Sequence, residues 1–226
     1  MKVVRGTEIL ETVEEIVDPK HTALLVIDIQ NDNSSPKGVL ASNGGDISWA
    51  RKCVARVKSV LEEARRLGMV VIFTKQAFVR DGSLESGTLL RMLHRKGWQA
   101  VAEHEEYELE GTWGSEVLDE LEPRPGERQI TKYRSSSFIG TALDFVLKSR
   151  GIKTTAIVGM VTEGCVESTV RDANQYDYYP VVLSDCVWSG RQDLHEAALL
   201  VMSARYDVIP SDDLVKVWRS ARARSG

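Results

Sequence analysis

A cysteine, a carboxylate and a lysine are the side chains of this sequence best suited to covalent chemistry. Cys165 follows the apolar segment 154–159 and opens a predicted helix, where the positive end of the helix dipole and unpaired N–H groups favour a thiolate. Asp28 ends an apolar run that begins at Thr22, and Lys132 ends another short segment. A carboxylate can accept the thiol proton and an ammonium group stabilises the anions, so we expect one reactive thiol of low pKa.

Strand and helix patterns alternate along the chain and set where these residues lie. The alternation predicts a three-layer, doubly wound α/β fold with a six-stranded parallel sheet, in a single domain over residues 1–226. The predicted strands are 22–29, 69–74, 128–132, 154–159, 180–184 and 206–209. The predicted helices are 47–64, with Asp46 as cap and Gly68 as stop, then 115–121, 138–150, 165–178, 192–205 and a last helix capped by Ser211.

The three residues are expected to meet because each lies at the carboxyl end of a predicted strand. Ligands of doubly wound sheets bind in the crevice beyond those ends. Each residue also has an ordinary structural explanation: an aspartate at a strand end often accepts a loop N–H, Lys132 could be solvated, and Cys165 could be a small core residue. The long irregular excursion 75–126 is the segment expected to shape the pocket.

Composition excludes several classes of protein. Of 226 residues, 29 are Lys or Arg and 33 are Asp or Glu, which gives a net charge of −4. No basic stripe is present to bind nucleic acid, and no apolar run is long enough to cross a membrane. Three cysteines, without signal-peptide features, fit a reducing environment, so we expect a cytoplasmic protein that acts on a small molecule.

Three sequence blocks, in this order, resemble the isochorismatase-like cysteine hydrolases. They are Asp28-Ile-Gln-Asn-Asp32, Lys132-Tyr-Arg-Ser-Ser-Ser-Phe138-Ile-Gly-Thr-Ala-Leu143, and Gly159-Met-Val-Thr-Glu-Gly-Cys165-Val-Glu-Ser-Thr-Val-Arg-Asp172-Ala. Gly111-Thr-Trp-Gly114 also fits the family, and the resemblance runs from about residue 22 to about residue 214.

The resemblance implies roles for particular residues. Asp28, Lys132 and Cys165 would form the catalytic triad. The peptide between Met160 and Val161 would be cis, and the N–H groups of Val161 and Cys165 would form the oxyanion hole. The family resemblance also implies a homo-oligomer, a dimer or a tetramer.

The block around Cys165 looks closest to the ureide and carbamoyl branch of the family. The expected reaction is hydrolysis of a C–N bond in a small linear amide or ureide, of the biuret, triuret, ureidoacrylate or N-carbamoyl type, through a thioester. Asn33 departs from the family, which often has phenylalanine there, so an aromatic pocket residue must come from elsewhere. The candidates for the pocket wall are Lys75, Gln76, Trp98, Trp113, Tyr133, Arg134, Phe138 and Arg205.

No metal and no organic cofactor are expected. The nicotinamidase branch carries paired histidines after its second strand, whereas the corresponding segment 74–78 has none. His21, His94, His104 and His195 show no ligand spacing, and His195-Glu196 lacks the second histidine of the H-E-x-x-H zinc motif. Neither a G-x-G-x-x-G motif nor a P-loop occurs.

Two other functions remain open at this point. A vinyl-ether hydrolase of the isochorismatase type needs the aspartate and no cysteine, so the presence of Cys165 argues against it. A catalytically silent binding protein on the same fold has no need of all three triad residues. Cys53 and Cys186 are expected to be packing residues.

Overall fold

The computed structural model describes residues 2–95 and 106–225. Its centre is a six-stranded, entirely parallel sheet in the order β5-β4-β3-β6-β7-β8. The strands are β3 (Thr22–Ile27), β4 (Val70–Gln76), β5 (Arg128–Lys132), β6 (Thr154–Met160), β7 (Tyr179–Trp188) and β8 (Asp207–Ile209). The predicted doubly wound sheet is therefore confirmed, strand by strand.

The order of the strands places a topological switch point between β3 and β6. The chain runs outward from β3 through β4 to β5 and then returns to β6 on the other side of β3. Both central strands are buried along their whole length, as the apolar runs of their sequences require. The crevice beyond the carboxyl ends of these two strands is where open α/β sheets bind ligands.

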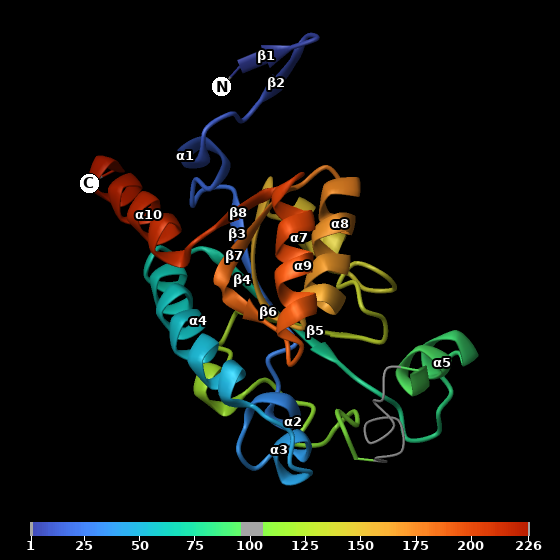
Figure 1. Ribbon diagram of the computed structural model, residues 1–226. Helices are drawn as coiled ribbons and strands as arrows, with labels where there is room; N and C mark the ends of the chain where they lie inside the picture. Colours follow the sequence, from blue (N-terminus) through green and yellow to red (C-terminus); the bar gives the residue numbers. More distant parts are fainter. Residues whose placement is uncertain (1, 96–105, 226) are drawn as a thin grey trace.

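Helices cover both faces of the sheet (Figure 1). On one face α4 (Ser48–Arg66) and α10 (Ser211–Ser225) pack with Leu24 and Val26 of β3. Alternate residues of that strand, Leu25 and Ile27, face the other layer. That layer consists of α7 (Leu143–Ser149), α8 (Glu167–Gln175) and α9 (Gln192–Ser203).

Three predicted helices differ from the observed ones. The predicted helix 138–150 begins only at Leu143, because Gly140 adopts a left-handed φ of 70° that a right-handed helix cannot contain. The predicted helix 165–178 begins earlier, with a π-helical turn η2 (Thr162–Val166) that contains Cys165 and leads into α8. The predicted helix 115–121 is reduced to the 3₁₀ turn η1 (Asp119–Leu121).

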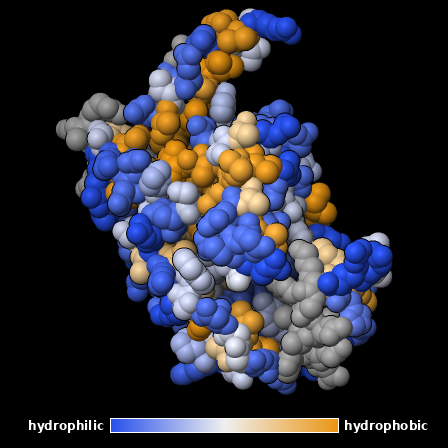
Figure 2. Space-filling model, in the orientation of Figure 1, coloured by the Kyte–Doolittle hydropathy of each residue, from blue (hydrophilic) through white to orange (hydrophobic). Residues whose placement is uncertain are grey.

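Several short elements were not predicted. They are the hairpin β1 (Lys2–Val4) and β2 (Thr7–Ile9), then α1 (Val13–Ile16), α2 (Asn31–Ser34), α3 (Val39–Ser42) and α5 (Gly87–Arg95). The hairpin projects from the body of the protein and exposes apolar side chains, among them Val3 and Val4 (Figure 2). Within the described ranges, no helix has the length and apolar character needed to cross a membrane.

Candidate active site

The three expected catalytic residues converge at the carboxyl edge of the sheet. Asp28 directly follows β3, Lys132 is the last residue of β5, and Cys165 lies in the turn after β6. Lys132 Nζ is 2.7 Å from Asp28 Oδ2 and 3.3 Å from Cys165 Sγ. The same ammonium also donates to Gln76 Oε1 and to the carbonyl oxygen of Arg134, each at 3.0 Å. One buried cation therefore connects the carboxylate to the thiol.

Lys132 reaches the centre by crossing the intervening strand β4. Its register partner on that strand is Gln76. The buried side-chain amide of Gln30, just beyond β3, holds the Gln76 backbone with two hydrogen bonds. Gln30 accepts from the Gln76 N–H at 2.9 Å and donates to its carbonyl at 2.8 Å. The Lys132 side chain is fully buried. Burial alone would lower the pKa of Lys132, but Asp28 and Cys165 outweigh burial and raise that pKa above its usual value.

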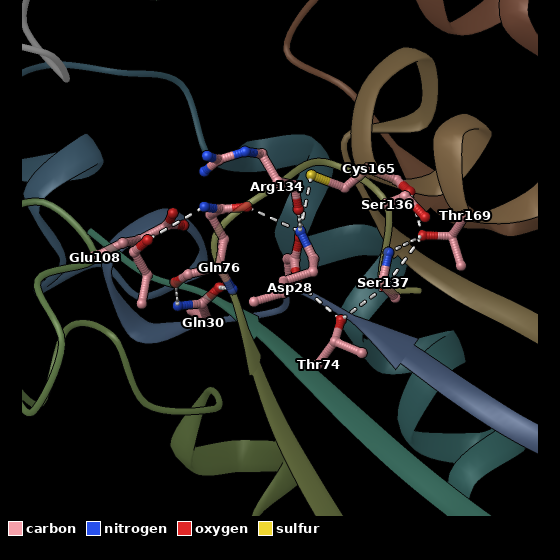
Figure 3. A network of polar contacts seen from close by, with 12 residues as sticks. Asp28, Gln30, Thr74, Gln76, Glu108, Arg134, Ser136, Ser137, Cys165 and Thr169 are labelled. Atoms are coloured by element: carbon pink, nitrogen blue, oxygen red, sulfur yellow. Dashed lines mark hydrogen bonds and ion pairs between the residues drawn. The ribbon is translucent and has the colours of Figure 1, made fainter. Parts of the chain in front are cut away.

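A chain of hydroxyl groups fixes Asp28 from the other side (Figure 3). Thr74 Oγ1 donates to Asp28 Oδ1 at 2.9 Å, and the Thr74 carbonyl accepts from the Asp28 N–H at 3.1 Å. Ser137 Oγ donates to Thr74 Oγ1 at 3.5 Å, and Thr169 Oγ1 lies 3.1 Å from Ser137 Oγ. Thr169 also bonds the carbonyl of Cys165 at 2.7 Å, so the chain links the carboxylate to the turn that carries the thiol.

The segment before Cys165 passes very close to β3. Gly159 has a φ of 132°, and a side chain there would collide with the backbone of Ile27, so only glycine fits. The peptide between Met160 and Val161 is cis, as the resemblance implied. Val161, Gly164 and Cys165 then line a cavity at the end of the sheet.

The expectation of a low thiol pKa is wrong for the resting site. Burial raises the pKa of the Cys165 thiol to about 12, Asp28 adds to the shift, and Lys132 only partly offsets it. The main cause is burial; the Lys132 ammonium lowers the pKa, but burial and the Asp28 carboxylate together outweigh it. Burial therefore favours the protonated thiol in the resting site.

The cavity holds about 220 Å³, the size of a small ligand. One part of its wall is apolar and comes largely from α5 and the segments beside it, with Phe78, Leu89, Met92 and Leu93. Met160 and Val161 add to the apolar surface, and the polar or reactive side chains of the wall include Asp28, Asn33, Gln76, Glu108, Arg134, Glu163 and Cys165. Such a wall can enclose a small polar molecule while excluding bulk water around it.

The pocket candidates from the sequence fall into two groups. Gln76 and Arg134 line the cavity. Of the others, Tyr133 donates to Glu110 at 2.8 Å, and Trp113 is 44% exposed beside Asp119. Three other candidates do not line the cavity, and the fourth cannot be placed. Lys75 pairs with Glu116, Phe138 stacks on Tyr176 in the core, Arg205 precedes β8 at the opposite edge of the sheet, and Trp98 lies outside the described residues.

Sequence reasoning missed the buried acid of the cavity wall. Glu108 is only 4% exposed, although it stands in the run Glu105-Glu106-Tyr107-Glu108-Leu109-Glu110, which reads as a solvated acidic stretch. Its partner is Asn33, whose Nδ2 donates to Glu108 Oε1 at 2.8 Å. The one sequence feature that pointed to this pair was asparagine in place of phenylalanine at position 33. Nothing in the sequence connected Asn33 to Glu108, which lies 75 positions later.

The remaining cysteines and histidines take structural positions. Cys186 lies inside β7, which extends beyond the predicted strand 180–184, and is fully buried, and Cys53 is partly buried on α4. His195 Nδ1 lies 2.8 Å from Thr162 Oγ1, against the turn before Cys165. Across residues 2–95 and 106–225, no group of three or more His, Cys, Asp or Glu side chains is arranged to hold a metal ion. His104 lies outside those ranges.

Comparison with known proteins identifies similar sequences. The model of the isochorismatase domain matches residues 22–212. Ureidoacrylate amidohydrolase RutB of Caulobacter segnis is 41% identical over 189 residues, which cover 81% of this chain and 79% of that protein. The protein of the same name from Agrobacterium fabrum is 35% identical over 172 residues, covering 74% of this chain and 75% of that protein.

Solved structures show the same fold. A cysteine hydrolase from Pseudomonas syringae pv. phaseolicola superposes with a TM-score of 0.78 at 23% identity, covering 91% of this chain and 96% of that one. N-carbamoylsarcosine amidase from Thermoplasma acidophilum superposes with a TM-score of 0.65 at 26% identity, covering 84% and 96%.

Proposed function

The chain belongs to the isochorismatase family, and on this premise we propose that it is a cysteine amidohydrolase of small linear ureides. Its relatives are named ureidoacrylate amidohydrolases, which supports a ureide as substrate class. The observation that carries the proposal is the contact of one buried ammonium, Lys132 Nζ, with both Asp28 and Cys165 at the wall of a small cavity. A silent binding protein has no use for that costly arrangement.

In the first half of the proposed reaction, Asp28 accepts the proton of the Cys165 thiol as the sulfur attacks the ureide carbonyl carbon. Because the resting thiol has a raised pKa, proton transfer and attack occur together rather than through a stable thiolate. The N–H groups of Val161 and Cys165 stabilise the oxyanion. The C–N bond then breaks, and Asp28 returns the proton to the departing nitrogen.

In the second half, water hydrolyses the thioester. Asp28 accepts one proton from the water as its oxygen adds to the carbonyl carbon, and the C–S bond breaks. The sulfur regains its proton from Asp28, so one water molecule is consumed and the site returns to its resting state. Lys132 remains charged throughout and balances the carboxylate.

A substrate panel tests this proposal. We expect ammonia, or a carbamate that decays to ammonia, from at least one of biuret, triuret, ureidoacrylate and N-carbamoylsarcosine. Nicotinamide should be poor, because its aromatic ring offers the polar groups of the wall fewer hydrogen-bond partners than a ureide does. The measurement is kcat/KM for each compound under one set of conditions. A tenfold or greater preference for nicotinamide or isochorismate would refute the ureide assignment.

We also propose that residues 1–226 form one hydrolase domain that assembles as a dimer or tetramer in the cytoplasm. The family match spans most of the chain, and the three cysteines are free thiols. Apolar side chains are exposed on α7 and α9, where Phe145 is 75% and Leu200 is 73% exposed. Exposed apolar surface of this kind supports association. Light scattering after gel filtration measures the mass, and a monomer at micromolar concentration would contradict the oligomer.

A further inference from the structure

Glu108 is a buried carboxyl that faces the cavity without belonging to the Asp28–Lys132–Cys165 contacts. It is 4% exposed and lines the same cavity as Cys165. Buried carboxyls are costly, and one placed against a ligand cavity needs an explanation beyond packing.

The backbone holds Glu108 in a conformation that its residue type avoids. Its φ is 47°, in the left-handed region that glycine favours. The N–H donates to Asp32 Oδ2 at 2.7 Å, and the carbonyl accepts from the Phe78 N–H at 3.0 Å. Gly114 makes room for this anchor, since a side chain there would collide with the Asp32 carboxylate. The fold therefore fixes both sides of a strained residue, and strain of this kind marks functional positions.

Asn33 sets the orientation of the Glu108 side chain. Its Nδ2 donates to Glu108 Oε1 at 2.8 Å and to the Asp28 carbonyl at 2.9 Å. Its Oδ1 accepts from the Gln30 N–H at 3.1 Å and from Ser34 Oγ at 2.7 Å. Because a backbone N–H can only donate, the Asn33 oxygen must face Gln30 and its amide nitrogen must face Glu108.

The surroundings hold the carboxyl in its neutral form. Burial and then the charge of Asp28 raise the pKa of Glu108 to about 8, while Asn33, Lys132 and Tyr107 oppose the shift. Since Oε1 accepts from Asn33, we assign the proton of the neutral acid to Oε2; the Tyr107 hydroxyl also hydrogen-bonds this carboxyl. The titratable and charged groups around this carboxyl are Asp28, Asp32, Tyr107, Lys132 and Cys165, with Arg134 and Glu163 on the same cavity wall.

We propose that Glu108, oriented by Asn33, determines substrate specificity by donating a hydrogen bond to an acceptor oxygen at the non-reacting end of the ureide. The ligand is thus a linear ureide that carries a second oxygen, either the second carbonyl of a biuret-type compound or the carboxylate of a ureido acid. This inference rests on the proposed function and adds the group that reads the far end of the substrate.

The polar pair also explains the departure at position 33. The family resemblance leads one to expect an aromatic side chain there, which would offer an apolar wall to the ligand. Asn33 and Glu108 replace that wall with a fixed hydrogen-bonding group. A site built to bond a substrate oxygen discriminates strongly against ligands that lack it.

Glu108→Gly is the cleanest deletion, because glycine tolerates the left-handed backbone and removes the carboxyl without strain. We expect KM to rise at least about tenfold for biuret or for ureidoacrylate, with kcat changed less than about threefold. Glu108→Gln keeps a neutral donor and should restore KM to within about threefold at about pH 6.5. The matched control is Asp177→Gly, a second left-handed residue (φ 68°) on an exposed turn outside the cavity, whose kinetics should equal the parent's.

The pH dependence of KM identifies the oxygen. In the parent, KM should rise between about pH 7 and 9 as Glu108 ionises, and it should stay level in Glu108→Gln. A rise confined to ureidoacrylate identifies a carboxylate, and an equal rise for biuret identifies a carbonyl. If Glu108→Gly keeps the parent KM for both compounds, the inference is wrong while the hydrolase stands. If the parent itself turns over none of biuret, triuret, ureidoacrylate and N-carbamoylsarcosine, the proposed function fails and this inference fails with it.

Discussion

The two sides of the cavity are built in different ways. The strand side, Asp28, Lys132 and Cys165, projects from the carboxyl edge of the sheet and is held by a parallel ladder. The loop side, Asn33 and Glu108, comes from a four-residue helix and an irregular segment, held by side-chain hydrogen bonds. The strand side balances a carboxylate with an ammonium, whereas the acid of the loop side faces its partner amide as a neutral group.

This difference separates chemistry from recognition. The sheet supplies positions that every member of the fold can use, because strand ends converge wherever the strand order reverses. Loops attached to that edge can change without disturbing the sheet, so they are suited to reading a particular substrate. Substitutions on the strand side should therefore reduce kcat, and those on the loop side should alter KM and its pH dependence.

The largest effect is expected from Cys165→Ser. A hydroxyl nearly matches the thiol in size but is far harder to ionise, so kcat should fall at least about 10³-fold with the fold intact. Circular dichroism and steady-state ammonia release measure the two properties. Cys53→Ser, on the partly buried thiol of α4, is the control and should retain activity. Retention of more than a tenth of the parent activity by Cys165→Ser would end the cysteine-hydrolase proposal.

Asp28→Asn should follow with a loss of about 10²–10⁴-fold in kcat, because an amide cannot accept the thiol proton. Asparagine tolerates the left-handed φ of 52° at this position, so the backbone should persist. The buried ammonium of Lys132 loses its counter-charge, which lowers the free energy of unfolding by up to about 3–5 kcal/mol. Urea unfolding measures that loss. Asp177→Asn, at a similar φ on the surface, should match the parent in both assays, and a fully active Asp28→Asn would remove this carboxylate from the mechanism.

The two sides also differ in how far the sequence predicts them. Asp28, Lys132 and Cys165 end or follow apolar runs, and parallel-strand topology brings such ends together, so periodicity and the family resemblance sufficed to predict that they meet. Glu108 meets Asn33 only through the path of an irregular segment, for which local sequence carries no periodic signal. The same limit explains why Gly140, read as part of a helix, instead delays its start to Leu143.

Glu108, on the loop side, should affect the pH dependence of the free energy of unfolding as well as KM. Glu108 has a folded-state pKa of about 8 against an ordinary value of 4.5, so the native state holds a proton that the unfolded state releases. Between about pH 4.5 and 8 the carboxyl is ionised in the unfolded state and neutral in the native state. The free energy of unfolding therefore falls as the pH rises through this range. Glu108→Gln removes this dependence and should gain, relative to the parent, on the order of a few kcal/mol between those limits. Parallel stability–pH curves for the two proteins would contradict a neutral Glu108.

A smaller effect is expected from the hydroxyl chain behind Asp28. Thr74→Val keeps the β-branched shape and removes one bond to the carboxylate, so kcat should fall about three- to tenfold. Thr155→Val is the matched control, since Thr155 is equally buried on a central strand and its hydroxyl has no hydrogen-bond partner among the described residues. That variant should keep full activity and lose no stability. Equal effects from both substitutions would mean that the chain does not orient Asp28.

Chelation is expected to have no effect on activity. The experiment tests whether the two sides of the cavity could share a cation. Asp28 and Glu108 both line the cavity, and a pair of carboxylates is a natural site for a divalent ion. Here, however, the Lys132 ammonium lies 2.7 Å from Asp28, and the Asn33 amide directs an N–H at Glu108. Both donors occupy the lone pairs that a metal would need, and the ammonium repels it. Activity should therefore survive exhaustive EDTA treatment, measured as ammonia release before and after dialysis; a loss that zinc, manganese or iron restores would place a cation between the two sides and overturn the neutral state assigned to Glu108.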